Sequence, residues 1–206
     1  VSSPQQVLDI EPRSVPEGIE LNISITGEAF AQLKNKRRNL TGRTGCGLCG
    51  AESLQQAKPL LQPVTSDIKI NHNALQVAIS SLEQHQHSHQ YLQQQTGAVH
   101  AATWCDTDGQ LVLAREDVGR HNALDKLLGA MAKQKLDVHS GFILVTSRAS
   151  YEMVVKTARA NIGILAAVSA PTSLAINLAK QSQIGLVGFS RSQRHVIYAG
   201  QSRFVE

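Results

Sequence analysis

The chain has 206 residues, somewhat more than the roughly 150 residues of a typical domain, so we expect a single domain covering residues 1–206. A hydrophobic fraction of 42% allows a packed core, while a charged fraction of 17% excludes a disordered chain. The net charge of +4 is too small for binding long nucleic acids, and no apolar run reaches the roughly 18 residues that cross a membrane.

The first half of the chain alternates predicted structure with breaks. Three prolines make residues 1–18 an extended lead-in, and alternating apolar and polar side chains predict a strand over 18–25. A short helix is expected over 28–36. Residues 38–50 contain four glycines and form a predicted mobile loop around a Cys-x-x-Cys motif. Helical spacing of apolar residues indicates the next helix, over 72–95.

The second half is more regular. Residues 98–105 and 110–115 flank a tight Asp-Thr-Asp-Gly turn, which predicts an antiparallel hairpin, and a helix follows over 122–134. Strands and helices then alternate, which predicts parallel strands whose two faces are both covered by helices. We therefore expect a three-layer α/β/α domain. The alternating elements are strands 141–147, 163–169 and 184–189, and helices 151–161 and 173–181.

Hydroxyl and arginine side chains follow the ends of these three strands. Ligands bind beyond the carboxyl ends of open parallel sheets, and helix starts there offer free N–H groups, so the pattern predicts a phosphate-binding site. The alternative is that the hydroxyls only cap helices and the arginines are solvated. The dinucleotide Gly-x-Gly-x-x-Gly motif and the phosphate loop of nucleotide hydrolases are both absent. The candidate residues are Ser147, Arg148, Ser169, Thr172, Ser190, Arg191 and Arg194.

A second polar group, formed by Asp117, Arg120 and His121, stands just before the helix predicted over 122–134. Its carboxylate and imidazole can hydrogen-bond a purine edge or a pterin. The alternative is a helix start capped by Asn122. The residues leave both interpretations open.

The three cysteines are Cys46, Cys49 and Cys105, too few for a disulfide scaffold and consistent with a reducing cytoplasm. The Cys46-x-x-Cys49 pair follows five cations, which favour the thiolate. Three uses are open: a zinc site, a redox pair, or a thiol that carries a sulfur atom or acyl group. Since no second close-spaced Cys pair and no His-x-Glu occurs, zinc and zinc-dependent deamination are disfavoured.

Several segments, in order along nearly the whole chain, resemble the FdhD/NarQ family, the formate dehydrogenase accessory sulfurtransferases. They are Gly42-Arg43-Thr44-Gly45-Cys46-Gly47-Leu48-Cys49-Gly50, Glu116-Asp117-Val118-Gly119-Arg120-His121-Asn122-Ala123-Leu124-Asp125-Lys126, Ser147-Arg148-Ala149-Ser150-Tyr151-Glu152-Met153, Ala167-Val168-Ser169-Ala170-Pro171-Thr172 and Leu186-Val187-Gly188-Phe189. Members of the family normally carry a further amino-terminal stretch, so an upstream segment is expected.

The resemblance implies a cytoplasmic sulfur carrier with a cytidine-deaminase-like fold. It implies that Cys46, with Cys49 beside it, takes sulfur as a persulfide from a cysteine desulfurase. The sulfur then passes to the molybdenum or tungsten bis-guanine-dinucleotide cofactor of formate dehydrogenase, bound as a substrate that GDP mimics. The cofactor-binding segment is Phe189-Ser190-Arg191-Ser192-Gln193-Arg194, where many members have Phe-Cys-Lys-Pro-Gly-Arg.

No permanently bound metal, nucleic acid or membrane is expected, and a homodimer is left open. Two other functions remain as alternatives. One is a cofactor-binding chaperone that moves no sulfur, and the other is a zinc-dependent deaminase-like enzyme.

Overall fold

The computed structural model describes residues 1, 3–34, 61–88, 95–191 and 194–206, which fall into two compact units. Cys46 and Cys49 therefore lie outside the described residues, as do the rest of the predicted loop over 38–50, Ser192 and Gln193. No helix in the described ranges is both long and apolar enough to cross a bilayer.

The first unit is an antiparallel hairpin followed by a helix. Strand β1 (Val7–Val15) pairs with β2 (Gly18–Ile25), and α1 (Gly27–Lys34) comes next, after a short 3-10 turn before β1. The expected lead-in is extended, but it is half of a hairpin rather than unpaired chain. Pro12 is tolerated because a two-stranded ribbon has only edge strands, where a missing N–H costs no ladder bond. Ile10 and Ile23 lie opposite each other on one side of this ribbon, and both side chains are exposed.

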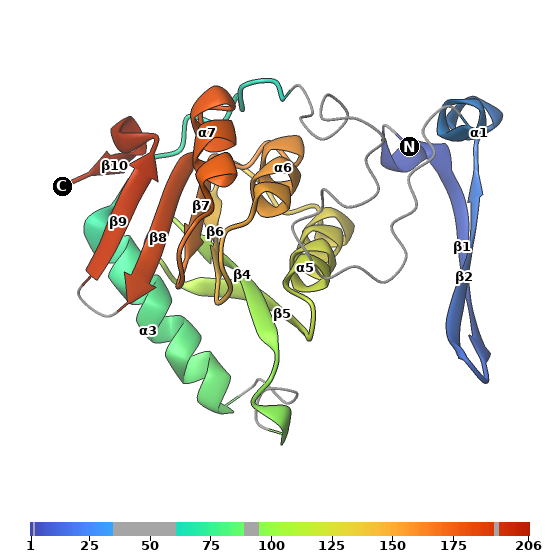
Figure 1. The fold of residues 1–206 in the computed structure, drawn as a ribbon, viewed down its shortest axis with the longest axis horizontal. Coiled ribbons are helices and arrows are strands. Elements are labelled where there is room, and N and C mark those ends of the chain that lie inside the picture. Colours follow the sequence, from blue (N-terminus) through green and yellow to red (C-terminus); the bar gives the residue numbers. More distant parts are fainter. Residues whose placement is uncertain (2, 35–60, 89–94, 192–193) are drawn as a thin grey trace. The chain divides into compact units, whose positions relative to one another are not determined.

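The second unit is built on a six-stranded sheet in the order β5-β4-β6-β7-β8-β9 (Figure 1). The predicted hairpin is present as β4 (His100–Asp106) and β5 (Leu111–Asp117). Strands β6 (Gly141–Val145), β7 (Ile164–Ala167) and β8 (Gly185–Arg191) are parallel, as their alternation with helices predicts.

The sheet is more mixed than expected. Strand β4 pairs antiparallel with β6, and a further strand, β9 (Arg194–Ala199), pairs antiparallel with β8. The predicted cofactor-binding segment over 189–194 therefore includes the end of β8 and the start of β9, which pair at Arg191 and Arg194. A small parallel pair, β3 (Ile70–Asn71) with β10 (Phe204–Val205), lies beside the carboxyl-terminal 3-10 turn over 201–203.

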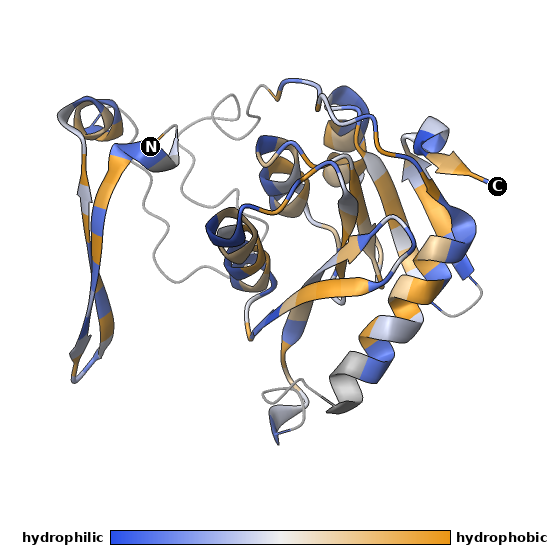
Figure 2. Cartoon of the chain, turned by 180° about the vertical axis from the view of Figure 1, so that it is seen from behind, coloured by the Kyte–Doolittle hydropathy of each residue, from blue (hydrophilic) through white to orange (hydrophobic). Residues whose placement is uncertain are grey.

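Helices cover both faces of the sheet and give the predicted three layers. Helix α3 (His72–Ser88) packs on one face, and α5 (Arg120–Gln134), α6 (Tyr151–Arg159) and α7 (Ser173–Gln181) pack on the other. Along β6 the side chains alternate, Phe142 and Leu144 toward α3, Ile143 and Val145 toward the other helices. Apolar colour gathers on these central strands in Figure 2. Continuous apolar strands thus bury both faces, as expected.

Candidate functional site

The predicted ligand residues that the structure describes lie along one side of the six-stranded sheet, where the ends of its strands are found. Parallel strands β6, β7 and β8 all end here, and the antiparallel strand β4 begins here at His100, across from Asp117 at the end of β5. Strand β9 also starts here, at Arg194. We call this the carboxyl edge. It brings together side chains from five places in the sequence, as the strand-end rule predicts.

His121 connects the starts of two helices at this edge. Its Nε2 lies 3.2 Å from Ser150 Oγ and 3.3 Å from Glu152 Oε2, at the start of α6. Burial lowers the pKa of His121, an effect that Glu152 opposes and the nearby Arg120 reinforces. The imidazole is therefore neutral near pH 7 and can exchange a proton with its neighbours or with a bound ligand.

Arg120 and His121 are the first two residues of α5 rather than residues preceding the helix. The helix begins earlier than expected because Gly119 is its N-cap, and glycine carries no side chain that would mark a cap. The alternative in which Asn122 caps this helix is also wrong, since its Nδ2 donates to Asp117 Oδ1 at 3.1 Å.

Asp117 holds the start of α5 in place. Its Oδ1 also accepts from Gly119 N at 2.9 Å, and its Oδ2 forms an ion pair with Lys126 Nζ at 2.6 Å. Burial alone would raise the pKa of Asp117, yet the hydrogen bonds from Lys126, Gly119 and Asn122 keep it below its ordinary value. Both oxygens thus have protein partners, while a role of Asp117 in ligand binding stays a prediction.

Positive charge gathers around His100, a residue that the sequence analysis did not single out. Burial lowers the pKa of His100, and the charges of Arg120 and Arg148 lower it further, which places both guanidinium groups within electrostatic range of this imidazole. The hairpin register was the available signal, because it sets His100 opposite Asp117 at the edge. Two arginines and a histidine at one place can bind an anion.

A small cavity of about 130 Å³ lies at the ends of β6, β7 and β8, beneath α3. Thr146, Val168, Ser190 and Arg191 line it from the strand ends. Ser190 is fully buried, and its Oγ has no hydrogen-bond partner in the described ranges. Leaving such a hydroxyl unpaired costs about 1–3 kcal/mol, so Ser190 is a ready partner for a ligand atom.

The backbone beside Ser190 is strained. Phe189 has a φ of 52°, in the left-handed region that a bulky residue rarely occupies, and the β8–β9 register shifts between Gly188 and Arg191. A hydrogen bond from Phe189 N to Ser169 O, at 3.2 Å, holds this conformation. Strain of this kind is concentrated at binding and catalytic sites, which agrees with the role predicted for the segment.

Two further predicted hydroxyls, those of Thr172 and Ser147, have local partners. Thr172 Oγ1 accepts from Ala175 N at 3.2 Å and caps α7, as the alternative interpretation has it. Ser147 is buried, and its Oγ donates to the Arg148 carbonyl at 3.1 Å. Arg194 stands beside a histidine pair that the sequence analysis missed, in which His72 Nδ1 lies 2.8 Å from His195 Nε2.

Within the described ranges, no three His, Cys, Asp or Glu side chains gather closely enough to hold a metal ion.

Comparison with known proteins identifies the family. The family model of the FdhD/NarQ family matches residues 1–205. A sulfur carrier protein FdhD of Cupriavidus necator is 53% identical over 203 residues, which are 98% of this chain and 69% of that protein. The protein of the same name from Xanthomonas campestris pv. campestris is 47% identical over the same share of this chain and 71% of its own length.

A solved structure from Desulfotalea psychrophila, described as a formate dehydrogenase accessory protein, aligns with a TM-score of 0.69 at 23% identity. It covers 100% of this chain and 74% of its own, and it supports the fold. The mixed sheet with helices on both faces is therefore a fold shared with that solved structure. The chain belongs to the FdhD/NarQ family, as its sequence motifs predict.

Proposed function

We propose that this protein is a sulfur carrier that loads sulfur on Cys46 and delivers it to a molybdenum bis-guanine-dinucleotide cofactor bound as a substrate at the carboxyl edge. The observation that carries the proposal is the 53% identity, over 98% of the chain, to a protein named as a sulfur carrier. The donor is a cysteine desulfurase, and the loaded cofactor serves formate dehydrogenase.

Loading is a thiol exchange. The Cys46 thiolate attacks the outer sulfur of the desulfurase persulfide, a new S–S bond forms on Cys46, and the desulfurase cysteine leaves as a thiolate. The cations before Cys46 raise its thiolate fraction near neutral pH. Release as sulfide requires two electrons. Cys49 supplies them by attacking the inner sulfur, which forms a Cys46–Cys49 disulfide and frees hydrosulfide.

The carboxyl edge offers what a guanine-dinucleotide cofactor needs. Its pyrophosphate groups require several cations, and the edge carries Arg120 and Arg148 near His100, together with Arg191 and Arg194 at the β8–β9 hairpin. The unpaired Ser190 hydroxyl adds a hydrogen-bonding group between the strand ends. Tungsten in place of molybdenum would leave these contacts unchanged, because they are made to the dinucleotide and not to the metal.

The test is sulfur loading. The protein is incubated with a cysteine desulfurase and cysteine and then weighed intact under non-reducing conditions. We expect wild type to gain sulfur and Cys46→Ala to gain none. Cys105→Ala is the matched control and should load like wild type, because Cys105 is fully buried. Equal loading of Cys46→Ala and wild type would show that Cys46 is not the acceptor.

A chaperone that binds the cofactor without moving sulfur is the second candidate, because the cations and Ser190 of the carboxyl edge do not depend on the cysteines. Titration with GDP separates the two. Two results together would favour the chaperone. The wild-type protein would gain no sulfur in the loading test, and a Cys46→Ala, Cys49→Ala double variant would bind GDP as wild type does.

A further inference from the structure

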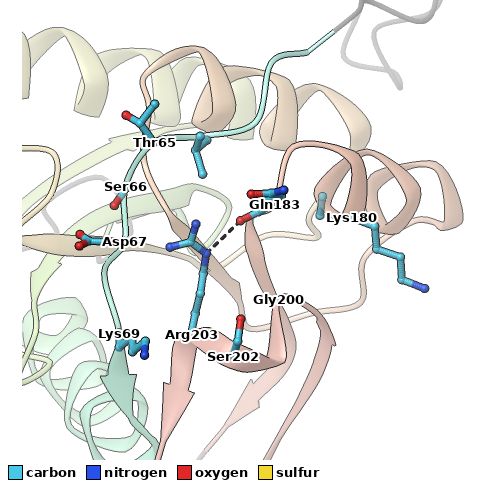
Figure 3. A pocket seen from close by; sticks show the side chains of 11 residues that line it. Thr65, Ser66, Asp67, Lys69, Lys180, Gln183, Gly200, Ser202 and Arg203 are labelled. Carbon is cyan, nitrogen blue, oxygen red and sulfur yellow. Dashed lines mark hydrogen bonds between the residues drawn. The ribbon is translucent and has the colours of Figure 1, made fainter.

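A second cavity lies at the opposite edge of the same sheet, away from every residue used above. It has a volume of about 540 Å³ and is found where the parallel strands begin, since Gln183 on its wall precedes β8. The segment 64–69, the end of α7 and residues 200–203 after β9 form its walls (Figure 3). We call it the amino-edge cavity.

Arg203 is the fixed cation of this cavity. Its Nε donates to the Gln183 carbonyl at 2.9 Å, and its Nη1 donates to the Ile68 carbonyl at 3.3 Å. A guanidinium has five N–H donors, and the other three have no protein acceptor in the part of the chain that the structure describes. The two backbone contacts hold the group in one orientation, so its remaining donors are preorganised for a ligand.

Ser66 provides an independent sign of a ligand. It lines the cavity, is only 2% exposed, and its Oγ has no hydrogen-bond partner among the described residues. A side-chain carbon added at Gly163 would lie 2.9 Å from both Ser66 Oγ and Arg203 Nη1. The hydroxyl and the guanidinium therefore both lie close to Gly163, at distances that leave no room for a side chain at that position. Buried polar groups normally have a partner, so the unpartnered Ser66 hydroxyl is a candidate contact for a ligand.

The charge and size of the cavity indicate what binds. Lys69 and Lys180 add positive charge at the wall, although Lys180 points away from Arg203, and Asp67 is the acidic residue among those lining it (Figure 3). The volume lies within the roughly 300–1,000 Å³ of small-molecule sites. Val64 and Ala179 supply an apolar wall.

We propose that the amino-edge cavity binds a small organic anion through a carboxylate or phosphate group. Arg203 pairs with the anionic oxygens, Ser66 donates a hydrogen bond to one of them, and the rest of the ligand lies against Val64 and Ala179. The site is separate from sulfur transfer at the carboxyl edge. It does not depend on the function proposed for that edge.

Titration by NMR tests the site residue by residue. Inorganic phosphate and acetate are added separately to isotope-labelled protein, and the backbone amide signals are followed. We expect one of the two anions to shift the signals of Ser66 and Arg203 along a saturating curve. The anion that does so identifies the group that is bound. Ser66→Ala should weaken its binding about tenfold, because a hydrogen bond to a charged group is lost.

Ser66→Ala removes a hydroxyl without a partner and is expected to fold. Arg203→Gln should abolish binding, but it also loses contacts to two carbonyls, so the conclusion depends on Ser66→Ala. The matched control is Ser80→Ala, an exposed serine on α3. The proposal is wrong if neither anion saturates these signals below about 50 mM. It is equally wrong if Ser66→Ala binds as wild type does.

A GDP titration of the same sample tests the carboxyl edge independently of the amino-edge cavity. GDP is expected to shift carboxyl-edge amides such as Ser147. If it does not, the function proposed for that edge fails while the result at Ser66 and Arg203 stands.

Discussion

Among single residues, Cys105 shows how strongly position decides the chemistry of a thiol. It is the one free cysteine in the described ranges, and burial raises its pKa to about 12. Its side chain packs between the sheet and α3, and its sulfur lies 3.7 Å from Thr103 Oγ1. A protonated and inaccessible thiol neither attacks a persulfide nor is readily alkylated.

We therefore predict that iodoacetamide labels Cys46 and Cys49 in the native protein and leaves Cys105 unmodified until the chain unfolds. Peptide mapping by mass spectrometry, with and without urea, measures this. Labelling of native Cys105 at the rate of Cys46 would contradict the burial of its side chain.

Single residues also show which parts of the carboxyl edge could be predicted from the sequence and which could not. The place of Arg148, His121 and Ser190 at the carboxyl edge could be predicted, because the sequence pattern sets them at the end of a strand or near the start of a helix. His100 was missed because it neither follows a strand end nor precedes a helix, and only the register of the β4–β5 hairpin, which sets it opposite Asp117, indicates its place. Whether Ser190 finds a hydrogen-bond partner depends on packing around it, which no sequence pattern encodes.

At the scale of elements, the start of α7 shows the cap that the sequence offered as the alternative to ligand binding by Thr172. Thr172 Oγ1 accepts from Ala175 N, which satisfies one of the helix's free N–H groups. We predict that Thr172→Ala lowers the free energy of unfolding by about 1 kcal/mol. Urea unfolding followed by circular dichroism measures the change.

Thr172→Ser is the matched variant, because it keeps the capping oxygen and removes only a methyl group. It should stay within about 0.5 kcal/mol of wild type. Equal losses in the alanine and serine variants would show that the cap contributes nothing and that the methyl group matters instead.

The elements that sequence predicted well are those with a local pattern. The strand and helix alternation from β6 to α7 follows from continuous apolar strands and 3.6-residue spacing. Two of the longer strands were missed for physical reasons. Strand β1 was missed because the prolines in 1–18 indicated an unpaired extended segment, and β9 was missed because the polar residues from Ser190 to Arg194 indicated a ligand-binding segment.

For the whole molecule, half-buried imidazoles contribute to the response to acid. Burial lowers the pKa of His100, His121 and His195 below the ordinary value of 6.5. As pH falls through 6.5, the unfolded chain binds these protons before the folded protein does, so the folded state loses stability. The pKa of Asp117 is also held low, and its contribution is lost at still lower pH, in the same direction.

We thus predict that the free energy of unfolding is greatest near neutral pH and falls as the pH drops below about 6.5. Urea titrations across this range measure it. His100→Gln should flatten the slope. His139→Gln, which replaces an exposed histidine, is the matched control. A flat profile between neutral and mildly acid pH would show that the three imidazoles titrate alike in the folded and unfolded chains.

The carboxyl edge has a consequence for when the protein can begin to work. Its side chains come from the starts or ends of six strands, between His100 and Arg194, and no two neighbouring elements supply the whole set. A chain still emerging from the ribosome therefore lacks part of this set of side chains. On the function proposed above, the cofactor binds only after the whole sheet has been synthesised and assembled.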